Sequence, residues 1–264
     1  MKAMKKILLM SFVALVAVAM TSCMHVKLGD KDWSFGDIHR NDTPTQVNQV
    51  GQVTAMEAFD ALNVCGPFNI ILEQGDTSSV RVEGTTEQLE KITIYVKEGE
   101  LYIDERESKW KGDEFKGMQI FVSTRAIKGI DIAGSGNVTA PKALAAANLS
   151  LEVAGSGDIT LAQLTCEELK IQIAGSGDVT SGPVQANKVK TEIAGSGNID
   201  IAALTCKMLD NEIAGSGDIV CNNLKVDQVK SDIAGSGDIY LKGQIGTHKE
   251  DIAGSGKVHV NESE

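Results

Sequence analysis

From residue 131 to residue 260, the chain repeats one order of apolar and polar positions about every 20 residues. Each repeat carries Ile or Val, then Ala-Gly-Ser-Gly, then usually Asp or Asn, then Ile or Val. The central serines of the seven repeats are Ser135, Ser156, Ser176, Ser196, Ser216, Ser236 and Ser255. Successive serines lie 21, 20, 20, 20, 20 and 19 residues apart. A fixed period of this length is typical of solenoid proteins, in which each repeat buries its apolar face only against its neighbours.

Within a repeat, apolar residues recur at fixed distances from the serine. With the serine as offset zero, offsets −3, +3 and +5 are apolar in most repeats, and offsets +8, +10 and +13 are apolar from the second repeat to the fifth. These offsets form pairs two residues apart that are separated by corners, which is the spacing of β-strands and not of helices. About 20 residues at roughly 3.3 Å per residue can enclose a narrow core in three short strands and three turns.

The pattern therefore predicts an all-β fold, a parallel β-helix or β-solenoid, built of rungs of about 20 residues each. Right-handed winding is expected, because parallel crossover connections are right-handed in nearly all proteins. At the corner, glycine supplies the positive φ that a sharp bend requires, and aligned serine hydroxyls can hydrogen-bond along the stack. Asp and Asn at offset +2 suit the end of a turn, because their side chains bond the local backbone.

Residues 50–130 form a less regular lead-in that also favours strands. Apolar positions alternate over residues 92–96 and again over residues 101–103, on either side of a Glu-Gly pair, and this pattern predicts a β-hairpin. Residues 86–91 favour a helical turn. The charged segment of residues 108–117 is expected to be a projecting loop.

One segment of the lead-in repeats the corner phrase in a degenerate form. Val64-Cys65-Gly66-Pro67-Phe68-Asn69-Ile70 aligns with Ile132-Ala133-Gly134-Ser135-Gly136-Asn137-Val138. We therefore expect residues 50–130 to contain degenerate rungs that continue, as one domain, into the regular repeats and C-terminal cap of residues 131–264. Two abutting domains are the alternative.

The first 22 residues have the features of a bacterial secretory signal. Three lysines precede an apolar run of 14 residues, which is shorter than the roughly 20 residues of a membrane span. Met20-Thr21-Ser22-Cys23 resembles the lipobox of bacterial lipoproteins, in which the cysteine is acylated and becomes the first residue of the mature chain. We expect a lipoprotein signal peptide over residues 1–22, lipidation of Cys23 and a flexible linker over residues 23–49. An ordinary signal peptide with an incidental cysteine is the alternative.

Composition and charge narrow the function. The 264 residues are 42% hydrophobic but only 4% aromatic, so the core must consist of aliphatic side chains in regular layers. The formal net charge is −11, and loss of residues 1–22 with their three lysines would leave −14. Such an acidic chain repels phosphate backbones, and no stripe of Lys or Arg is apparent. Nucleic-acid binding is therefore not expected.

Two groups of the repeats invite a chemical interpretation. The glycine-flanked serines differ from the Gly-x-Ser-x-Gly elbow of hydrolases and have no repeated histidine beside them, so no catalytic residue is expected. Acidic side chains at offset +2 repel one another unless they are hydrogen-bonded or bridged by a cation. Solvated turn carboxylates are the favoured interpretation, and a ligand or calcium ladder is the alternative. The aspartates of this ladder are Asp158, Asp178, Asp218 and Asp238.

The cysteines of the repeats indicate packing. Cys166 and Cys206 occupy the same offset two rungs apart, which corresponds to about 9.6 Å at the spacing of strands. A disulfide requires Cα atoms within about 7 Å, so these two cysteines should not pair. Small buried thiols are expected instead, and no metal-binding cysteine spacing is present in the sequence.

Several segments together resemble the head GIN domain family of autotransporter adhesins. The resemblance spans residues 59–240 and rests on residues 59–70, the Glu-Gln-Gly-Asp turn at residues 73–76, residues 96–103 and the Gly-Ser-Gly-Asp repeats. It implies a β-helical protein of the cell envelope with a role in adhesion. It supplies no catalytic residues.

The sequence as a whole predicts a cell-envelope lipoprotein of the outer membrane whose β-solenoid is a binding, adhesion or structural module and not an enzyme. Its expected partners are the membrane, through the lipid anchor, and a glycan or an envelope or host protein. No cofactor is expected apart from the calcium alternative. The alternative function is a polysaccharide-processing enzyme, which would need a few carboxylates on one face of the β-helix.

Overall fold

The structure, a computed structural model, describes residues 26–28, 31–33, 47, 49–106 and 114–262. The chain divides into two compact units, Met1–Pro44 and Thr45–Glu264. In the first unit, β1 (Val26–Leu28) pairs antiparallel with β2 (Lys31–Trp33), within the segment for which a linker is predicted. The predicted signal peptide and the lipidation site Cys23 lie outside the described residues. No helix in the described part of the chain is long and apolar enough to cross a membrane.

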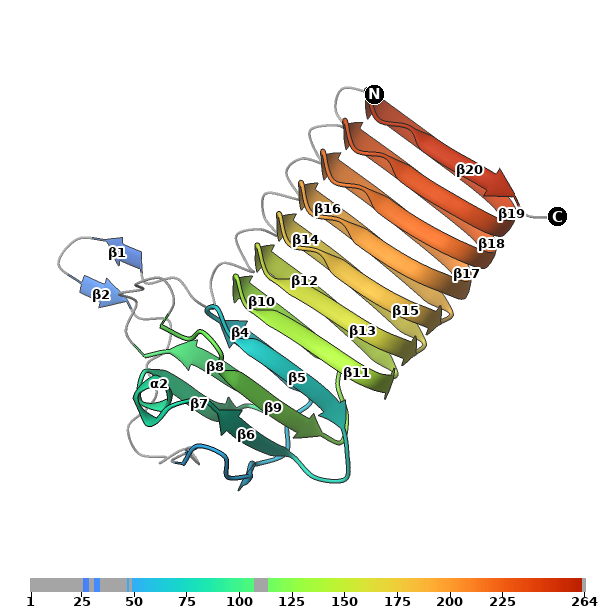
Figure 1. Cartoon of the computed structure of the whole chain (residues 1–264). Helices are drawn as coiled ribbons and strands as arrows, with labels where there is room; N and C mark the ends of the chain where they lie inside the picture. The colour runs from blue at the N-terminus through green and yellow to red at the C-terminus, as the bar shows by residue number, and fades with distance from the viewer. Residues whose placement is uncertain (1–25, 29–30, 34–46, 48, 107–113, 263–264) are drawn as a thin grey trace. The chain divides into compact units, whose positions relative to one another are not determined.

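The second unit contains a parallel β-solenoid of about seven turns, which confirms the fold that the repeats predict (Figure 1). Each rung has a strand before the Gly-Ser-Gly corner and a strand after it. The strands before the corner are β4 (Ala61–Cys65), β10 (Gly129–Gly134), β12 (Asn148–Gly155), β14 (Glu168–Gly175) and β16 (Lys188–Gly195). The strands after it are β5 (Asn69–Gln74), β11 (Asn137–Ala145), β13 (Asp158–Thr165) and β15 (Val179–Gln185).

Toward the C-terminus, the strand after one corner continues without interruption into the strand before the next. This gives the long strands β17 (Ile199–Gly215), β18 (Ile219–Gly235) and β19 (Ile239–Gly254), followed by β20 (Val258–Glu262). The rungs pair in parallel and in register, so that equivalent positions of adjacent repeats lie side by side. One offset in the sequence therefore becomes one column along the stack.

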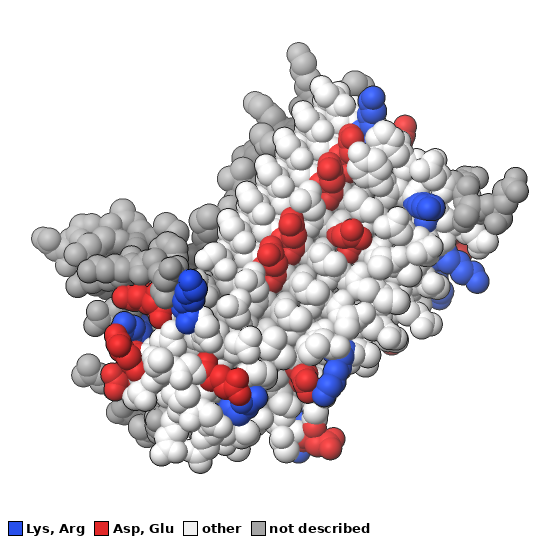
Figure 2. Space-filling view, viewed as in Figure 1, with Lys and Arg blue, Asp and Glu red and all other residues white. Residues whose placement is uncertain are grey.

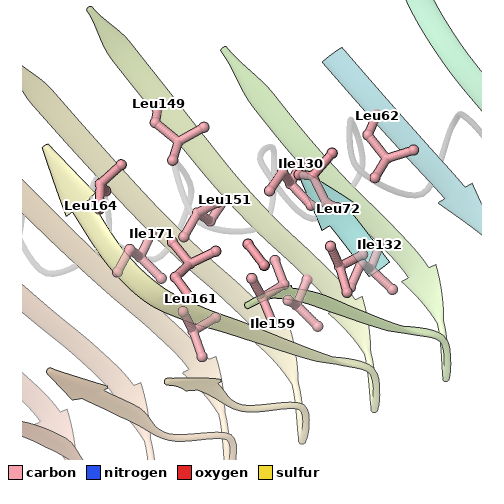
Figure 3. Close-up of a cluster of buried hydrophobic side chains, with 14 of the residues drawn as sticks. Leu62, Leu72, Ile130, Ile132, Leu149, Leu151, Ile159, Leu161, Leu164 and Ile171 are labelled. Atoms are coloured by element: carbon pink, nitrogen blue, oxygen red, sulfur yellow. The ribbon is translucent and has the colours of Figure 1, made fainter. Parts of the chain in front are cut away.

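The predicted apolar columns fill the core of the solenoid. Ile159, Leu161 and Leu164, which stand for offsets +3, +5 and +8, are each at most 1% exposed (Figure 3). The last rung differs, since Ile252 and Val260 are 36% and 37% exposed. Burial of aliphatic side chains from every rung against the next supplies the main force that holds the stack together.

A further column at offset −5 also faces the core and changes from apolar to polar along the stack. Its six central members are all fully buried, and they are Ile130, Leu151, Ile171, Thr191, Asn211 and Ser231. The Thr191 hydroxyl donates a hydrogen bond to Asn211 Oδ1 at 2.7 Å, whereas Asn211 Nδ2 has no hydrogen-bond partner. This column is not predicted from the sequence, because half of its side chains are polar.

At each corner, successive rungs approach so closely that only glycine fits. The first glycine of the phrase has a positive φ, for example +140° at Gly195. A Cβ atom on the second glycine, Gly197, would lie 2.0 Å from the carbonyl oxygen of Gly177. The backbone N–H of Ser196 donates to the carbonyl of Gly175 at 2.8 Å. The serine hydroxyls are exposed and bond to no described residue, so the expected hydroxyl ladder along the stack is wrong.

The lead-in contributes further rungs. β4 and β5 pair with β10 and β11 in the register that the degenerate corner predicts, with Val64 beside Ile132 and Ile70 beside Val138. On their other side, β4 and β5 pair in parallel with β8 (Glu100–Glu105) and β9 (Gln119–Thr124). The rung formed by β4 and β5 thus lies between two rungs made from later parts of the chain.

An antiparallel layer covers the free edge of β8 and β9. The predicted hairpin joins β7 (Ile92–Lys97) to β8, and Glu98 takes a positive φ at its turn. β6 (Ser79–Glu83) pairs antiparallel with β9 on one side and with β3 (Thr54–Ala55) on the other. Because this layer does not follow the repeat, its pairing is not predicted from the sequence.

A short helix connects β6 to β7. α2 (Thr86–Glu90) is the predicted helical turn, and a capping box of Thr85 and Gln88 closes its N-terminus. The segment expected to project as a loop is folded inward at its end. Phe115 is 5% exposed and packs edge-on against Phe68, with the ring centroids 5.0 Å apart. Burial of one aromatic ring is enough to turn this end of a charged segment toward the core.

Candidate functional site

The strands before the corner present three offsets to the surface. Neighbouring side chains of a strand point to opposite faces, so offsets −8, −6 and −4 point outward where offsets −7, −5 and −3 fill the core. We call the surface made by these three offsets the outer face. Offset −6 brings Ser150, Lys170 and Lys190 side by side on adjacent rungs, and offset −8 brings Glu168 beside Lys188. The outer face therefore joins charges that are far apart in the sequence.

A groove of about 310 Å³ lies on the outer face over β12, β14 and β16. Its lining residues are Lys128, Asn148, Leu149, Ser150, Glu168, Leu169, Lys170, Lys188 and Lys190. We call it the lysine groove. Four lysines and one glutamate give its lining a formal charge of +3, whereas the whole chain carries −11. A positive groove on an acidic protein concentrates anions at one point of the surface.

Two of the four groove lysines have an acidic partner. Lys128 Nζ lies 2.9 Å from Asp60 Oδ1, and this hydrogen bond raises the pKa of Lys128. Lys190 forms an ion pair with Glu192. The side chains of Lys170 and Lys188 form no ion pair with any residue that the structure describes. Their ammonium groups are therefore available to a bound anion.

Beside the lysines, offset −4 forms a column of acidic and amide side chains. Burial, followed by the charges of Glu152 and Glu100, raises the pKa of Asp131 to about 7. Gln172 interrupts the column of charges, and its Nε2 donates to Glu192 Oε2 at 2.6 Å. The remaining carboxyl groups lie one strand spacing from one another, where like charges repel. One carboxyl of this crowded column therefore changes its charge near neutral pH.

The predicted ligand or calcium ladder at offset +2 bonds to the backbone. Oδ1 of each member accepts a hydrogen bond from the backbone N–H one rung later, over 2.7–3.1 Å. The members are Asn137, Asp158, Asp178, Asn198, Asp218 and Asp238. The bond from Lys257 lowers the pKa of Asp238. The ladder ties the rungs together, and a row of acidic side chains crosses the strands on the face that Figure 2 shows.

Groups that catalysis or metal binding would need are dispersed. No three His, Cys, Asp or Glu side chains of the described residues lie close enough to hold a metal ion, and calcium at the ladder stays a prediction. Ser231 Oγ lies 3.2 Å from His248 Nε2, but Ser231 is fully buried. His259 stacks on Tyr240 near the last rung, with the ring centroids 4.7 Å apart. These contacts bring no exposed nucleophile to a base.

Three cysteines of the solenoid are buried thiols. Cys166, Cys206 and Cys221 are free, which confirms that the two cysteines sharing an offset, Cys166 and Cys206, do not pair. Burial raises the pKa of Cys166 to about 11 and the pKa values of Cys206 and Cys221 to about 12. At neutral pH these thiols are protonated and unreactive, and they fill space between aliphatic neighbours.

The lysine groove corrects the expectation that no basic stripe exists. Offset −6 is lysine in four repeats, at Lys170, Lys190, Lys230 and Lys249. Alignment of the repeats at this offset reveals the column, although each lysine alternates with acids along the chain. Lys128 and Lys188 occupy other offsets and line the groove only because of the fold.

The fold is shared with solved structures of low sequence identity. A structure described as a "putative adhesin" from Bacteroides fragilis gives a TM-score of 0.72 at 24% identity, over 79% of this chain and 95% of that one. A "putative lipid binding protein" from Parabacteroides distasonis gives 0.64 at 21% identity, over 82% of this chain and 98% of that one. A "putative adhesin" from Parabacteroides merdae gives 0.64 at 19% identity, over 81% and 95%. At such identities, the likeness shows the fold alone.

At the level of sequence, no curated protein matches the chain. A family model described as "putative auto-transporter adhesin, head GIN domain" matches residues 58–222 and residues 209–263. The two matches cover most of the chain and include the lead-in segments and the repeats on which the resemblance rests. The chain therefore belongs to the head GIN domain family of auto-transporter adhesins.

Proposed function

We propose that the protein is a lipid-anchored module of the cell envelope that binds a ligand on the outer face of its solenoid and catalyses no reaction. The observation that carries this proposal is the lysine groove, in which two ammonium groups without an acidic partner lie on an otherwise acidic chain. Membership of an adhesin family supports a binding role. The expected ligand is a glycan or an envelope or host protein.

The proposed location is the outer membrane. The basic N-terminus, the apolar run of 14 residues and the lipobox-like segment ending at Cys23 support export and lipidation. An adhesin family supports a place at the cell surface or in the envelope, because adhesion requires contact with material outside the cell. Two acyl chains on one cysteine would anchor the protein durably, since each buried CH₂ contributes about 0.8 kcal/mol.

Repetition supports binding over catalysis. An active site is a unique cluster of a nucleophile or base with groups that orient it. The outer face instead repeats similar columns from rung to rung, and the ladder aspartates bond to the backbone. No observation on the described residues favours the polysaccharide-processing alternative.

The binding role is tested with the purified full-length protein in detergent micelles on an array of glycans and of envelope and host proteins. We expect saturable binding to at least one member of the array. Silence across the whole array, from a sample whose circular dichroism shows folded β-structure, would overturn the binding function. In the same cells, a palmitate analogue should label the wild-type protein and leave Cys23→Ser unlabelled.

A further inference from the structure

The composition of the lysine groove selects one class of ligand. We propose that the groove binds an acidic polysaccharide, whose carboxylate or sulfate groups are held by Lys170, Lys188 and Lys190. The inference rests on the binding function proposed above and assigns it a site and a ligand chemistry. Three features of the groove support it: the pairing of its cations, the acceptors among them and the small apolar area of its floor.

The cations of the groove are crowded and incompletely neutralised. Lys170 and Lys190 occupy equivalent positions on adjacent rungs, which lie about 4.8 Å apart. Ammonium groups so close together repel each other. Glu192 offsets the charge of Lys190, but Lys170 has no acidic partner, and Lys188 forms no ion pair with the neighbouring Glu168. An anion between these lysines would neutralise charge that the protein itself leaves uncompensated.

Hydrogen-bond acceptors lie among the cations. Glu168, Asn148 and Ser150 line the same groove. Sugar hydroxyls can donate to the carboxylate and amide oxygens and accept from the ammonium groups. A polysaccharide with anionic groups spaced along neutral sugars can therefore use both kinds of group. A nucleic acid carries a charge on every unit, and the neighbouring acidic column would repel it.

The floor of the groove argues against a lipid tail. Leu149 and Leu169 line the groove, but each is only 2% exposed, because their side chains point into the core. An acyl chain gains free energy in proportion to the apolar area that it buries, and this floor offers very little. The groove lies on a strand surface that repeats every rung, which suits an extended polymer more than a compact molecule.

The experiment measures binding of the full-length protein in detergent micelles to immobilised alginate and dextran sulfate, with neutral dextran as reference. The test variant is Lys170→Gln/Lys188→Gln, and the matched control is Lys207→Gln/Lys225→Gln. Both variants remove two exposed positive charges that form no ion pair with described residues, but Lys207 and Lys225 do not line the groove. Thermal unfolding of all three proteins checks that the fold is kept.

We expect the wild type and the control to bind at least one acidic polysaccharide and to ignore dextran. The groove variant should bind about tenfold more weakly, which corresponds to two exposed charge contacts of up to about 1 kcal/mol each. Its binding should also depend less on salt concentration, because fewer charges are involved.

Three results would overturn the inference. The groove variant could bind as tightly as the wild type, the control could lose as much affinity as the groove variant, or duplex DNA could bind with the same dependence on Lys170 and Lys188. If the array instead identifies a neutral glycan or a protein whose binding survives these substitutions, the inference fails while the binding function stands. If no ligand of any class binds, both fail.

Discussion

The carboxyl group of Asp131 lies between Glu152 on the next rung and Asn63 on the rung before. Its neighbours shield it from water and add negative charge, so the neutral form is favoured and the pKa rises from 3.8 to about 7. The acid repeats at offset −4 are visible in the sequence. Burial of this particular member is not, because it depends on the lead-in strand β4 that lies beside β10.

Asp131→Asn should stabilise the protein at pH 8 and have less effect at pH 5. A folded pKa above the unfolded one makes the contribution of the group to stability complete below pH 3.8 and lost as the pH rises through about 7. The amide removes this loss, so the midpoint of thermal unfolding should rise by a few degrees at pH 8. Asp200→Asn, at an exposed position, is the matched control. Equal shifts of the Asp131 variant at pH 5 and pH 8 would contradict the assignment.

At the scale of the strands, the ladder at offset +2 links each rung to the next at the exit of the corner. Asp178 Oδ1 accepts from the backbone N–H of Asn198 at 2.8 Å and from its Nδ2 at 3.0 Å. Asn at the same offset, as in Asn137, offers the same carbonyl oxygen without the charge. The alternation of Asp and Asn along the ladder therefore reflects a shared need for an acceptor.

Asp178→Ala should lower the free energy of unfolding by about 1 kcal/mol, because the Asn198 N–H loses its acceptor. Asp178→Asn keeps the oxygen and should stay close to the wild type. Urea denaturation followed by circular dichroism measures both. An Asn variant as unstable as the Ala variant would show that charge matters more than the acceptor. A rise in melting temperature on adding calcium, lost in Asp178→Asn, would support the calcium hypothesis instead.

The strand columns show where prediction from the sequence succeeds and where it stops. Columns of aliphatic residues are predictable because a polar residue there would be costly to bury. The column with Thr191 and Asn211 is not, because these two side chains satisfy part of their hydrogen-bonding capacity with each other inside the core. The lysine groove is equally hidden, since Lys170 and Lys190 become neighbours only through the register.

At the scale of the molecule, the repeat period predicts the solenoid because each rung has the same partners as the last. The capping layer of β6 and β7 has no such regularity, and its antiparallel pairing follows from a hairpin and from the return of the chain to β9. Only the hairpin has a local signal, the Glu98-Gly99 turn. The rest of this end depends on contacts between distant segments, for which a single sequence offers no period to align.

A charge in the central column should destabilise the whole stack. Ile193 is fully buried and pairs with Ile173 and Ile213 on the two adjacent rungs. Ile193→Asp places an unpaired carboxylate in this column and should lower the free energy of unfolding by about 3 kcal/mol or more.

Thr180→Asp is the control, because Thr180 is exposed and Asp200 already occupies the equivalent position on the next rung. Thermal unfolding of both variants by circular dichroism is the measurement. Wild-type-like melting of Ile193→Asp would refute the assignment of the column to the core.

The position of β4 and β5 between later segments has a consequence for the order of folding. Ala61 pairs with Glu100 and with Gly129, which follow it by 39 and 68 residues, whereas rungs of the regular stack pair over about 20 residues. Closing longer loops costs more entropy, and non-local pairing slows folding. A chain emerging from its N-terminus must therefore keep both edges of β4 open until these partners arrive. The base of the solenoid is the slow step of assembly, and the remaining rungs can add quickly once it has formed.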